Sequence, residues 1–330
     1  MSWVQLKEGR PLGTSDPVLF RSGGESPGRI DQYRQPVETM SGGCGMSHDQ
    51  VFSNYRAVAA AFGAHHEARL KMYRPLTIAM CREAAVPETA PASGYSLVDV
   101  AGGTGDVALD VAAGLGPGAT VWCADIVPEM VAQAAQAAAS VGLTNMHCKE
   151  SSAESLSFED ATFDAVLCRF GIMFFSNPQE SAREALRVLK PRGRVAFGVW
   201  GTRAANPFHR VLLDVLDRHV DRPAPDPDAP GAFRHASPGK LASILREAGG
   251  TDVRETTFRF EIELPSFDHY FEFRTATSDT LLEKLRRMPA AERERFKDEV
   301  EQGAQEYLTS ECIRFPVETL IVSGSRKPTR

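Results

Sequence analysis

Short apolar runs alternate with amphipathic helical segments through the middle of the chain. The apolar runs predict five strands, at residues 96–100, 119–124, 145–148, 163–168 and 194–200. Between them, residues 106–114, 128–141 and 178–189 have the three- and four-residue apolar spacing of helices. Strands that alternate with helices in this way predict βαβ units, and therefore a parallel sheet with helices on both faces.

The pattern changes after residue 200. Helices are predicted at 207–220 and 238–248, and residues 253–264 and 313–323 alternate as two long strands. Residues 190–193 are predicted to form a turn before the fifth strand, and residues 221–231 a Pro/Asp-rich loop. Between the two long strands lie about 48 residues, 265–312, with helical spacing over 281–288 and 290–308. We expect this insertion to be a lid over a site or an interface with a second copy of the chain.

The start of the chain has two further parts. Residues 1–46 are rich in Gly, Ser, Pro and isolated charges, which predicts a disordered arm. Residues 47–94 form a predicted N-terminal helical cap, in which Tyr55, Val58 and Phe62 lie on one helix face. The remaining predicted units are an α/β core over 95–264, the insertion over 265–312, and a last core strand with its tail over 313–330.

Composition narrows the class of protein. The chain has 330 residues, 42% of them hydrophobic and 24% charged, as in globular proteins with an ordinary core. The net charge of −6 provides no basic field for nucleic acid, and no apolar run reaches the length of a membrane span. The six cysteines form no CxxC pair and the eight histidines have no metal-ligand spacing, so we expect no metal and a cytoplasmic protein.

The strongest chemical signal is a glycine-rich turn between the first strand and the following helix. It contains Gly102, Gly103, Thr104 and Gly105, and glycine permits both a tight turn and close approach of a ligand. Asp125 ends the next strand twenty residues later, where a carboxylate can accept both ribose hydroxyls of an adenosine group.

Two classes of nucleoside cofactor use this arrangement. Asp99 precedes the glycines and Asp106 follows them, and both carboxylates would repel the pyrophosphate of NAD. S-adenosyl-L-methionine has an amino group and a sulfonium instead of phosphates, so it is favoured. The alternatives are an NAD(P)-dependent oxidoreductase and a non-catalytic binding module on the same fold. Asp106 can also serve only as a cap of the following helix.

Five motifs together give a resemblance to a known family. They are Asp99-Val-Ala-Gly-Gly-Thr-Gly-Asp106, Ala124-Asp-Ile-Val-Pro-Glu-Met130, Ala153-Glu-Ser-Leu-Ser-Phe158 with Phe163-Asp164, Arg169-Phe-Gly171, and Val188-Leu-Lys-Pro-Arg-Gly-Arg-Val195. The chain resembles the class I S-adenosylmethionine-dependent methyltransferases, most closely the ubiquinone/menaquinone C-methyltransferase branch (methyltransferase domain types 11 and 25). The resemblance implies a Rossmann-like sheet of seven strands with an antiparallel last strand, to which 253–264 and 313–323 would contribute strands six and seven.

The resemblance also implies a set of cofactor-binding residues. They are Tyr55, Asp99, Gly102, Gly103, Thr104, Gly105, Asp125, Ile126, Met130, Ser152, Ala153, Glu154, Arg169 and Phe170. Ser152 stands where family members often have Asp or Asn for the adenine amine. The segment from Gly171 to Phe175 and the N-terminal helices also differ from those of the quinone enzymes, which disfavours a quinone substrate.

The acceptor is expected beyond the carboxyl ends of strands four and five. The candidate pocket residues there are Met173, Phe174, Phe175, Trp200, Phe208 and Phe271. Their apolar and aromatic character predicts methyl transfer to an O, C or N atom of a small, flat or apolar molecule. His209, His66 and His235 are the candidate general bases, because histidine is suited to deprotonating a phenol or enol.

Overall fold

The computed structural model describes residues 48–219 and 226–328, whose centre is one seven-stranded sheet. Its strands are β1 (Tyr95–Val100), β2 (Ala119–Asp125), β3 (Met146–Glu150), β4 (Phe163–Arg169), β5 (Leu189–Trp200), β6 (Thr251–Leu264) and β7 (Ile313–Ser325). Their spatial order is β3-β2-β1-β4-β5-β7-β6, and β7 runs antiparallel to both of its neighbours. This confirms the predicted seven-stranded, Rossmann-like sheet with an antiparallel last strand.

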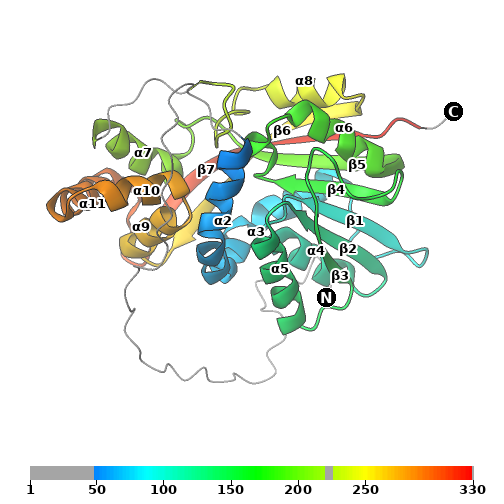
Figure 1. Cartoon of the computed structure of the whole chain (residues 1–330), viewed down its shortest axis with the longest axis horizontal. Coiled ribbons are helices and arrows are strands. Elements are labelled where there is room, and N and C mark those ends of the chain that lie inside the picture. Colours follow the sequence, from blue (N-terminus) through cyan, green and yellow to red (C-terminus); the bar gives the residue numbers. More distant parts are fainter. Residues whose placement is uncertain (1–47, 220–225, 329–330) are drawn as a thin grey trace.

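Helices cover both faces of the sheet (Figure 1). On one face lie α3 (His66–Glu83), α4 (Asp106–Leu115) and α5 (Pro128–Ser140), and the other face carries α6 (Pro178–Val188), α7 (Pro207–His219) and α8 (Lys240–Glu247). The helices begin where the sequence favours it. Pro128 and Pro178 occupy first turns, and the Asn177 side chain accepts a hydrogen bond from the Glu180 amide at 3.1 Å.

The parallel strands bring the loops of the site to one edge of the sheet. β1 pairs with β2 on one side and with β4 on the other, so their carboxyl ends lie next to one another. The loop after β1 contains the glycines, and the loop after β4 contains η1 (Ile172–Phe174). A ligand at this edge can therefore contact segments that are about 70 residues apart in the sequence.

The N-terminal helices α2 (His48–Ala64) and α3 are joined to the core by ion pairs. Arg74 of α3 lies 2.7 Å from Asp110 of α4, and Arg69 lies 2.8 Å from Asp106 at the start of the same helix. Both carboxylates are buried, so the pairs are held in place by the packing of α3 against α4. The arm predicted over residues 1–46 lies outside the described residues.

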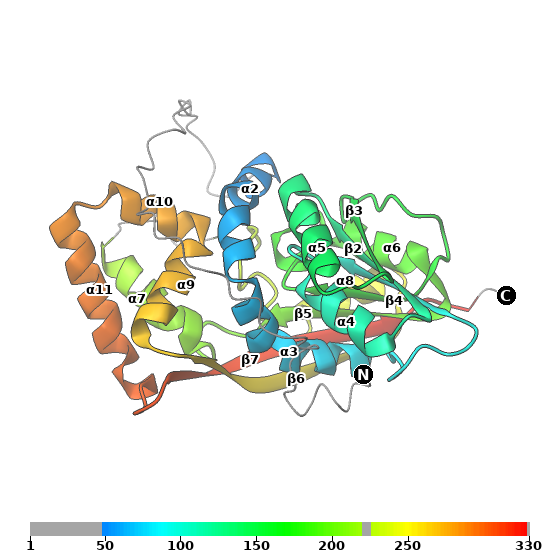
Figure 2. The same cartoon turned by 90° about the horizontal axis from the view of Figure 1, so that it is seen from below.

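The insertion between β6 and β7 folds into α9 (Phe267–Ala276), α10 (Asp279–Arg287), α11 (Ala290–Ala304) and η2 (Gln305–Tyr307). In both views these helices gather at one end of the molecule, with α11 against α7 and α10 against α2 (Figures 1 and 2). Helical spacing predicts α10 and α11 but not α9. The first turn of α9 is capped by Ser266, which accepts a hydrogen bond from the His269 amide at 3.3 Å.

Residues 190–193 do not form the predicted turn but belong to β5. The pairing of β4 with β5 is irregular between Phe163 and Ala165, and Arg192 has a φ of 67°. The chain that follows β7 stabilises this irregular stretch: Arg192 donates its amide to the Arg326 carbonyl at 3.2 Å, and Arg326 donates its amide to the Gly193 carbonyl at 2.9 Å. Backbone hydrogen bonds with Arg326 thus outweigh the local preference of residues 190–193 for a turn.

Candidate functional site

A cavity of about 510 Å³ lies at the carboxyl ends of β1, β2, β4 and β5. The helices α2, α3 and α9 contribute the wall away from the sheet. Of the predicted cofactor residues, those that line the cavity are Tyr55, Asp99, Gly102, Gly103, Asp125, Ile126, Met130, Ser152, Ala153, Glu154, Arg169 and Phe170. One site therefore collects these residues from five separate segments of the chain.

The glycine loop presents its backbone to this cavity. The Gly102 amide donates to the Ala124 carbonyl at 3.1 Å, which joins the loop to the end of β2. Gly103 has a φ of 56°, and a Cβ atom built on it would meet no atom within 4 Å, so the space in front of it is open. Gly105 has a φ of 88°, but a Cβ there would press on Met146 and Ala134. Gly103 thus faces the cavity, whereas Gly105 permits close packing of the loop on its neighbours.

Asp125 is fixed at the end of β2 by two backbone amides. One carboxylate oxygen accepts a hydrogen bond from Gly103 N at 2.8 Å and the other from Val127 N at 2.9 Å. Burial raises the pKa of this carboxyl, and the amide donors counteract part of that rise. Each carboxylate oxygen accepts one bond and retains a further lone pair on the cavity side, as binding of two ribose hydroxyls requires.

Asp99 is a buried carboxyl without a partner. Its side chain is 1% exposed, it lines the cavity, and neither of its oxygens has a hydrogen-bond partner among the described residues. Burial raises its pKa to about 8, and the nearby carboxylates of Asp106 and Asp125 add to the rise although Arg169 opposes it. A buried acid of this kind is costly unless a donor or a cation approaches it, so the cavity is suited to a ligand with an amino group.

Asp106 has a different role from the one predicted. Its carboxylate does not line the cavity but binds three basic side chains: Arg69 at 2.8 Å, Arg169 at 3.0 Å and His66 at 2.9 Å. Burial alone would raise the pKa of Asp106, but Arg69, His66 and Arg169 together hold it well below its usual range. Its charge is therefore neutralised and does not repel a phosphate. Because two guanidiniums share one carboxylate, this end of the cavity wall has excess positive charge.

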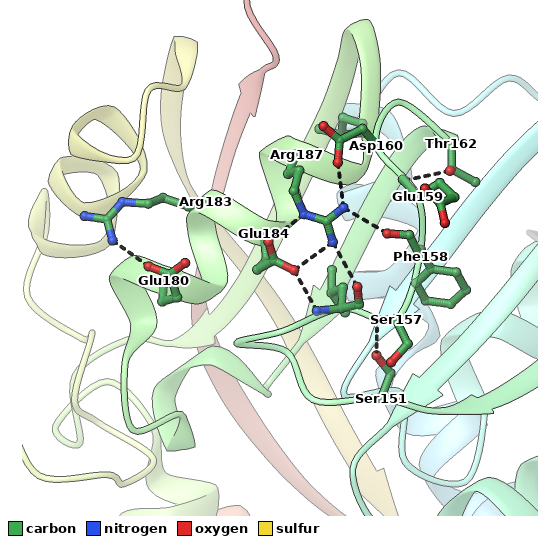
Figure 3. A network of polar contacts seen from close by, with 12 residues as sticks. Ser151, Ser157, Phe158, Glu159, Asp160, Thr162, Glu180, Arg183, Glu184 and Arg187 are labelled. Atoms are coloured by element: carbon green, nitrogen blue, oxygen red, sulfur yellow. Dashed lines mark hydrogen bonds and ion pairs between the residues drawn. The ribbon is translucent and has the colours of Figure 1, made fainter.

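The segment after β3 forms the wall opposite the glycine loop. It contains Ser152, Ala153 and Glu154, and the network in Figure 3 holds it in place. Arg187 of α6 is its centre: the guanidinium donates to the carbonyls of Leu156 and Phe158, each at 2.9 Å. Arg187 also pairs with Glu184 at 2.6 Å, and Glu184 accepts the Leu156 amide at 2.7 Å. This irregular segment is thus supported from behind and kept in position beside the cavity.

Aromatic rings form the other half of the cavity. Phe170 stacks on Trp200 with ring centroids 4.2 Å apart, and Tyr73 packs edge-on against both rings. Tyr55 packs edge-on against Phe174 at 5.4 Å, and Met173 and Phe175 complete the predicted residues of this wall. Phe170 has a φ of 61°, which is rare for a bulky residue, and such strain is common at binding sites.

The structure separates the three candidate histidines. Only His209 of these three lines the cavity; it lies edge-on to Trp200 at 4.4 Å, and its Nε2 has no hydrogen-bond partner among the described residues. Burial, reinforced by Arg274, keeps its pKa well below the usual range, so its imidazole is neutral at neutral pH. His66 instead pairs with Asp106, and His235 is buried outside the cavity lining with its pKa lowered to about 4 by burial.

Four other predicted residues lie outside the lining. Thr104 accepts a hydrogen bond from Arg69 at 2.9 Å and belongs to the Asp106 cluster, while Gly105 packs against α5. Phe208 is fully buried in the core, and Phe271 packs against Phe267 and Phe296 within the insertion. Sequence reasoning missed Phe62, Arg69, Tyr73 and Arg274, which all line the cavity. They come from α2, α3 and α9, where no recognisable motif marks them.

The described residues contain neither a metal-binding cluster nor a membrane-spanning helix. Within residues 48–219 and 226–328, no three His, Cys, Asp or Glu side chains are grouped as a metal site would require. In the same part of the chain, no helix has the length and apolar character needed to cross a membrane.

Comparison with known proteins agrees with this geometry. Residues 98–197 match the methyltransferase domain family. The ubiquinone/menaquinone biosynthesis C-methyltransferase of Brucella anthropi is 39% identical over 130 residues, which are 39% of this chain and 46% of that protein. An uncharacterized protein of Mycobacterium tuberculosis is 31% identical over 175 residues, or 53% of this chain and 60% of that protein. The chain thus spans about half the length of these curated relatives.

A solved structure shares the fold over most of the chain. The 4+2 cyclase SpnF superposes with a TM-score of 0.54 at 19% identity, covering 87% of this chain and 98% of that one. Residues 98–197 thus match the methyltransferase domain family, and the seven-stranded sheet that contains them shares the fold of this solved structure.

The first prediction compares Gly103→Val with Gly116→Val. Both glycines have a positive φ, of 56° and 76°, and open space where a Cβ would lie, but Gly116 is outside the cavity lining. Gly103→Val should lose about 1–2 kcal/mol of folding stability from backbone strain. Gly116→Val should lose more, because its ψ of −174° places it in a region of backbone conformation that is open almost to glycine alone. Only Gly103→Val should lose S-adenosylmethionine binding, as measured by calorimetry. Normal binding by folded Gly103→Val would show that the loop does not hold the cofactor.

The second prediction concerns Asp99→Asn. The unfolded chain ionises Asp99 near its ordinary pKa of about 3.9, whereas the folded ligand-free protein keeps it protonated to about pH 8. The contribution of Asp99 to the free energy of unfolding is therefore full below about pH 3.9 and is lost as the pH rises toward 8.

Asp99→Asn stays neutral throughout, so it should raise the melting temperature of the ligand-free protein more at about pH 9 than at about pH 4. It should also weaken S-adenosylmethionine binding roughly tenfold or more, because it removes the charged partner of the amino group. Differential scanning calorimetry and titration calorimetry measure the two effects. An equal stability change at both pH values would contradict the buried, protonated state of Asp99.

Proposed function

We propose that this protein is an S-adenosylmethionine-dependent methyltransferase that acts on a small, flat or apolar molecule. The observation that carries the proposal is Asp99, a buried and unpartnered carboxyl beside an open glycine backbone and a fixed Asp125. The amino group of S-adenosylmethionine gives Asp99 its missing donor. A pyrophosphate cofactor would leave it unsatisfied, which disfavours the oxidoreductase alternative.

The remaining parts of the site fit the rest of that cofactor. Asp125 would hold the ribose hydroxyls, and the excess positive charge of Arg69 and Arg169 would attract the methionine carboxylate. Ile126 and Met130 would contact the adenine, with Ser152, Ala153 and Glu154 at its edge. When bound, S-adenosylmethionine supplies a methyl group already activated on a positively charged sulfur.

The acceptor would lie in the aromatic half, against the packed rings of Phe170, Trp200 and Tyr73. Because the rings exclude water, they favour a flat apolar frame and hold it against the cofactor side of the cavity. His209 has a neutral imidazole in this half, and its Nε2, which has no partner among the described residues, would form a hydrogen bond with an acceptor hydroxyl or amine. Most of the rate enhancement would come from position and water exclusion.

A ligand comparison followed by an assay tests this function. S-adenosylmethionine and S-adenosylhomocysteine should raise the melting temperature, and NADH should not. Mass-spectrometric detection of methylated products from a panel of small aromatic compounds then distinguishes an enzyme from a binding module. Thermal stabilisation by NADH alone would overturn the proposal. Cytoplasmic location, the absence of a nucleic-acid partner and homodimer formation stay predictions from sequence.

The third prediction concerns Asp125→Ala. The change removes a charged acceptor from two hydroxyls and should weaken S-adenosylhomocysteine binding by about 2–4 kcal/mol, because charged hydrogen bonds contribute about 1.5–3 kcal/mol each and are not fully additive. Titration calorimetry on the folded variant measures the loss. An unchanged affinity would show that Asp125 does not bind the ribose.

The fourth prediction compares two phenylalanines of α9. Phe273 is 3% exposed and lines the cavity, whereas Phe271 packs within the insertion. Phe273→Ala should impair acceptor turnover and leave cofactor affinity nearly unchanged, since the cofactor residues lie in the other half. Phe271→Ala should change stability alone. If both variants retain full turnover, α9 is not a wall of the acceptor site, and a change of mass in light scattering would favour the interface alternative.

A further inference from the structure

The acidic side chains that line the cavity all lie in its cofactor half, where Arg69 and Arg169 lie as well. The acidic side chains of the lining are Asp99, Asp125 and Glu154, which follow or end β1, β2 and β3. Arg203, Arg274 and His209 lie beyond β5, in α9 or near α7, and no carboxylate lines that half among the described residues. Three strand spacings, roughly 14 Å, separate β2 from β5 in the sheet.

Arg274 is the cation of this half that has no counter-charge. Its Nε is buried without a hydrogen-bond partner, and no ion pair joins it to a carboxylate among the residues that the structure describes. Its guanidinium carbon lies 5.0 Å from the centroid of the Phe208 ring. The ionisable groups that most favour its charge are the phenols of Tyr270, which also forms a side-chain hydrogen bond with it, and of Tyr73. Burial raises the pKa of both phenols, so both are neutral and neither supplies a counter-charge.

Arg203 provides the contrast within the same wall. Its guanidinium lies 2.6 Å from Asp214 and 2.8 Å from Asp217, so its charge is already balanced. Arg69 and Arg169 share Asp106 in the cofactor half. A desolvated cation without a partner is costly to folding, and proteins retain one where a ligand supplies the anion. The structure thus leaves a single unbalanced guanidinium facing the place of the acceptor.

We propose that the acceptor carries an anionic oxygen, either a carboxylate or an ionised enol or phenol, on a flat apolar frame, and that Arg274 binds this oxygen. The inference rests on the proposed function and assigns the substrate class of the same site. A guanidinium with free N–H groups gives strong charge-assisted hydrogen bonds to such an oxygen. The aromatic rings of Phe170, Trp200 and Phe273 would enclose the frame. An anion here also attracts the sulfonium charge of the cofactor, which favours their approach.

Matched pairs of probes test this assignment on the full chain saturated with S-adenosylhomocysteine. The first pair is 2-naphthoate and 2-naphthamide, which have the same frame with and without charge. The second pair is 4-hydroxycoumarin, whose enol is ionised at neutral pH, and coumarin. Titration calorimetry should show that one anionic probe binds roughly 10- to 100-fold more tightly than its neutral partner, as expected for a charged hydrogen bond in a dry site. The pair that discriminates identifies carboxylate or enolate.

Variants then locate the cause of the preference. Arg274→Gln should abolish the anion preference while S-adenosylhomocysteine binds within about twofold of the wild type. Arg274→Lys, which retains the charge, should keep part of the anion preference. Arg203→Gln should keep all of that preference, because the charge of Arg203 is already balanced by Asp214 and Asp217. Removing an unpaired buried cation should leave the melting temperature unchanged or higher, so loss of preference in Arg274→Gln is not a folding defect.

Three results overturn the inference. One is a wild type that binds S-adenosylhomocysteine but none of the four probes, and another is equal affinity within both pairs. The third is an anion preference that survives in Arg274→Gln. Failure of the wild type to bind S-adenosylhomocysteine at all would instead overturn the proposed function, so the two failures are distinguishable.

Discussion

The buried carboxylate of Asp106 holds the candidate site together. It receives Arg69 from α3, Arg169 from the end of β4 and His66 from the first turn of α3, while Thr104 adds the glycine loop to the same cluster. Three segments far apart in the sequence therefore converge on one charge. Removing this acid would leave several buried cations without a counter-charge. The resulting loss of folding stability is far larger than the loss caused by breaking a surface ion pair. The N-terminal helices thus form part of the site and not an attachment to it.

This convergence also fixes the electrostatics of the cavity. The two arginines are held by Asp106 with their guanidiniums at the cavity wall, while Asp99 lies nearby without any cation of its own. The cavity thereby presents cationic guanidiniums and a buried carboxyl that can ionise when an ammonium group approaches it. A ligand with both an amino group and a carboxylate satisfies both, and this dipolar arrangement distinguishes an amino-acid group from a phosphate more sharply than any single residue. The glycine loop determines where a ligand can lie, and the charges around the loop determine which chemical groups that ligand must carry.

The sheet was predictable from the sequence because each βαβ unit lies in one continuous stretch of the chain. The glycine loop and Asp125 also lie in short continuous stretches, so the sequence placed both at the same edge of the sheet, where they line the cavity. The sequence did not reveal the cavity-lining side chains that reach the site from distant elements. Arg69 is one of three arginines in α3, and Arg274 lies in α9, a helix that the sequence spacing does not predict. No motif near either arginine marks the direction of its side chain. His209, His66 and His235 are alike in sequence, and only the packing of α7 against the sheet places His209 at the cavity.

The insertion shows how a common core acquires its own specificity. β6 and β7 pair along twelve register positions without help from the helices between them, so the sheet does not depend on the insertion. Its helices could therefore vary in sequence at little cost to the core, and α9 uses this freedom to present Phe273 and Arg274 to the cavity. In such an arrangement the cofactor half, held by the sheet and Asp106, is constrained by stability and binding together. In the proposed acceptor half, Arg274 differs from the buried rings around it, because it contributes an unbalanced charge that folding by itself would disfavour. On this proposal, the residue that selects the substrate lies in the insertion and not in the sheet.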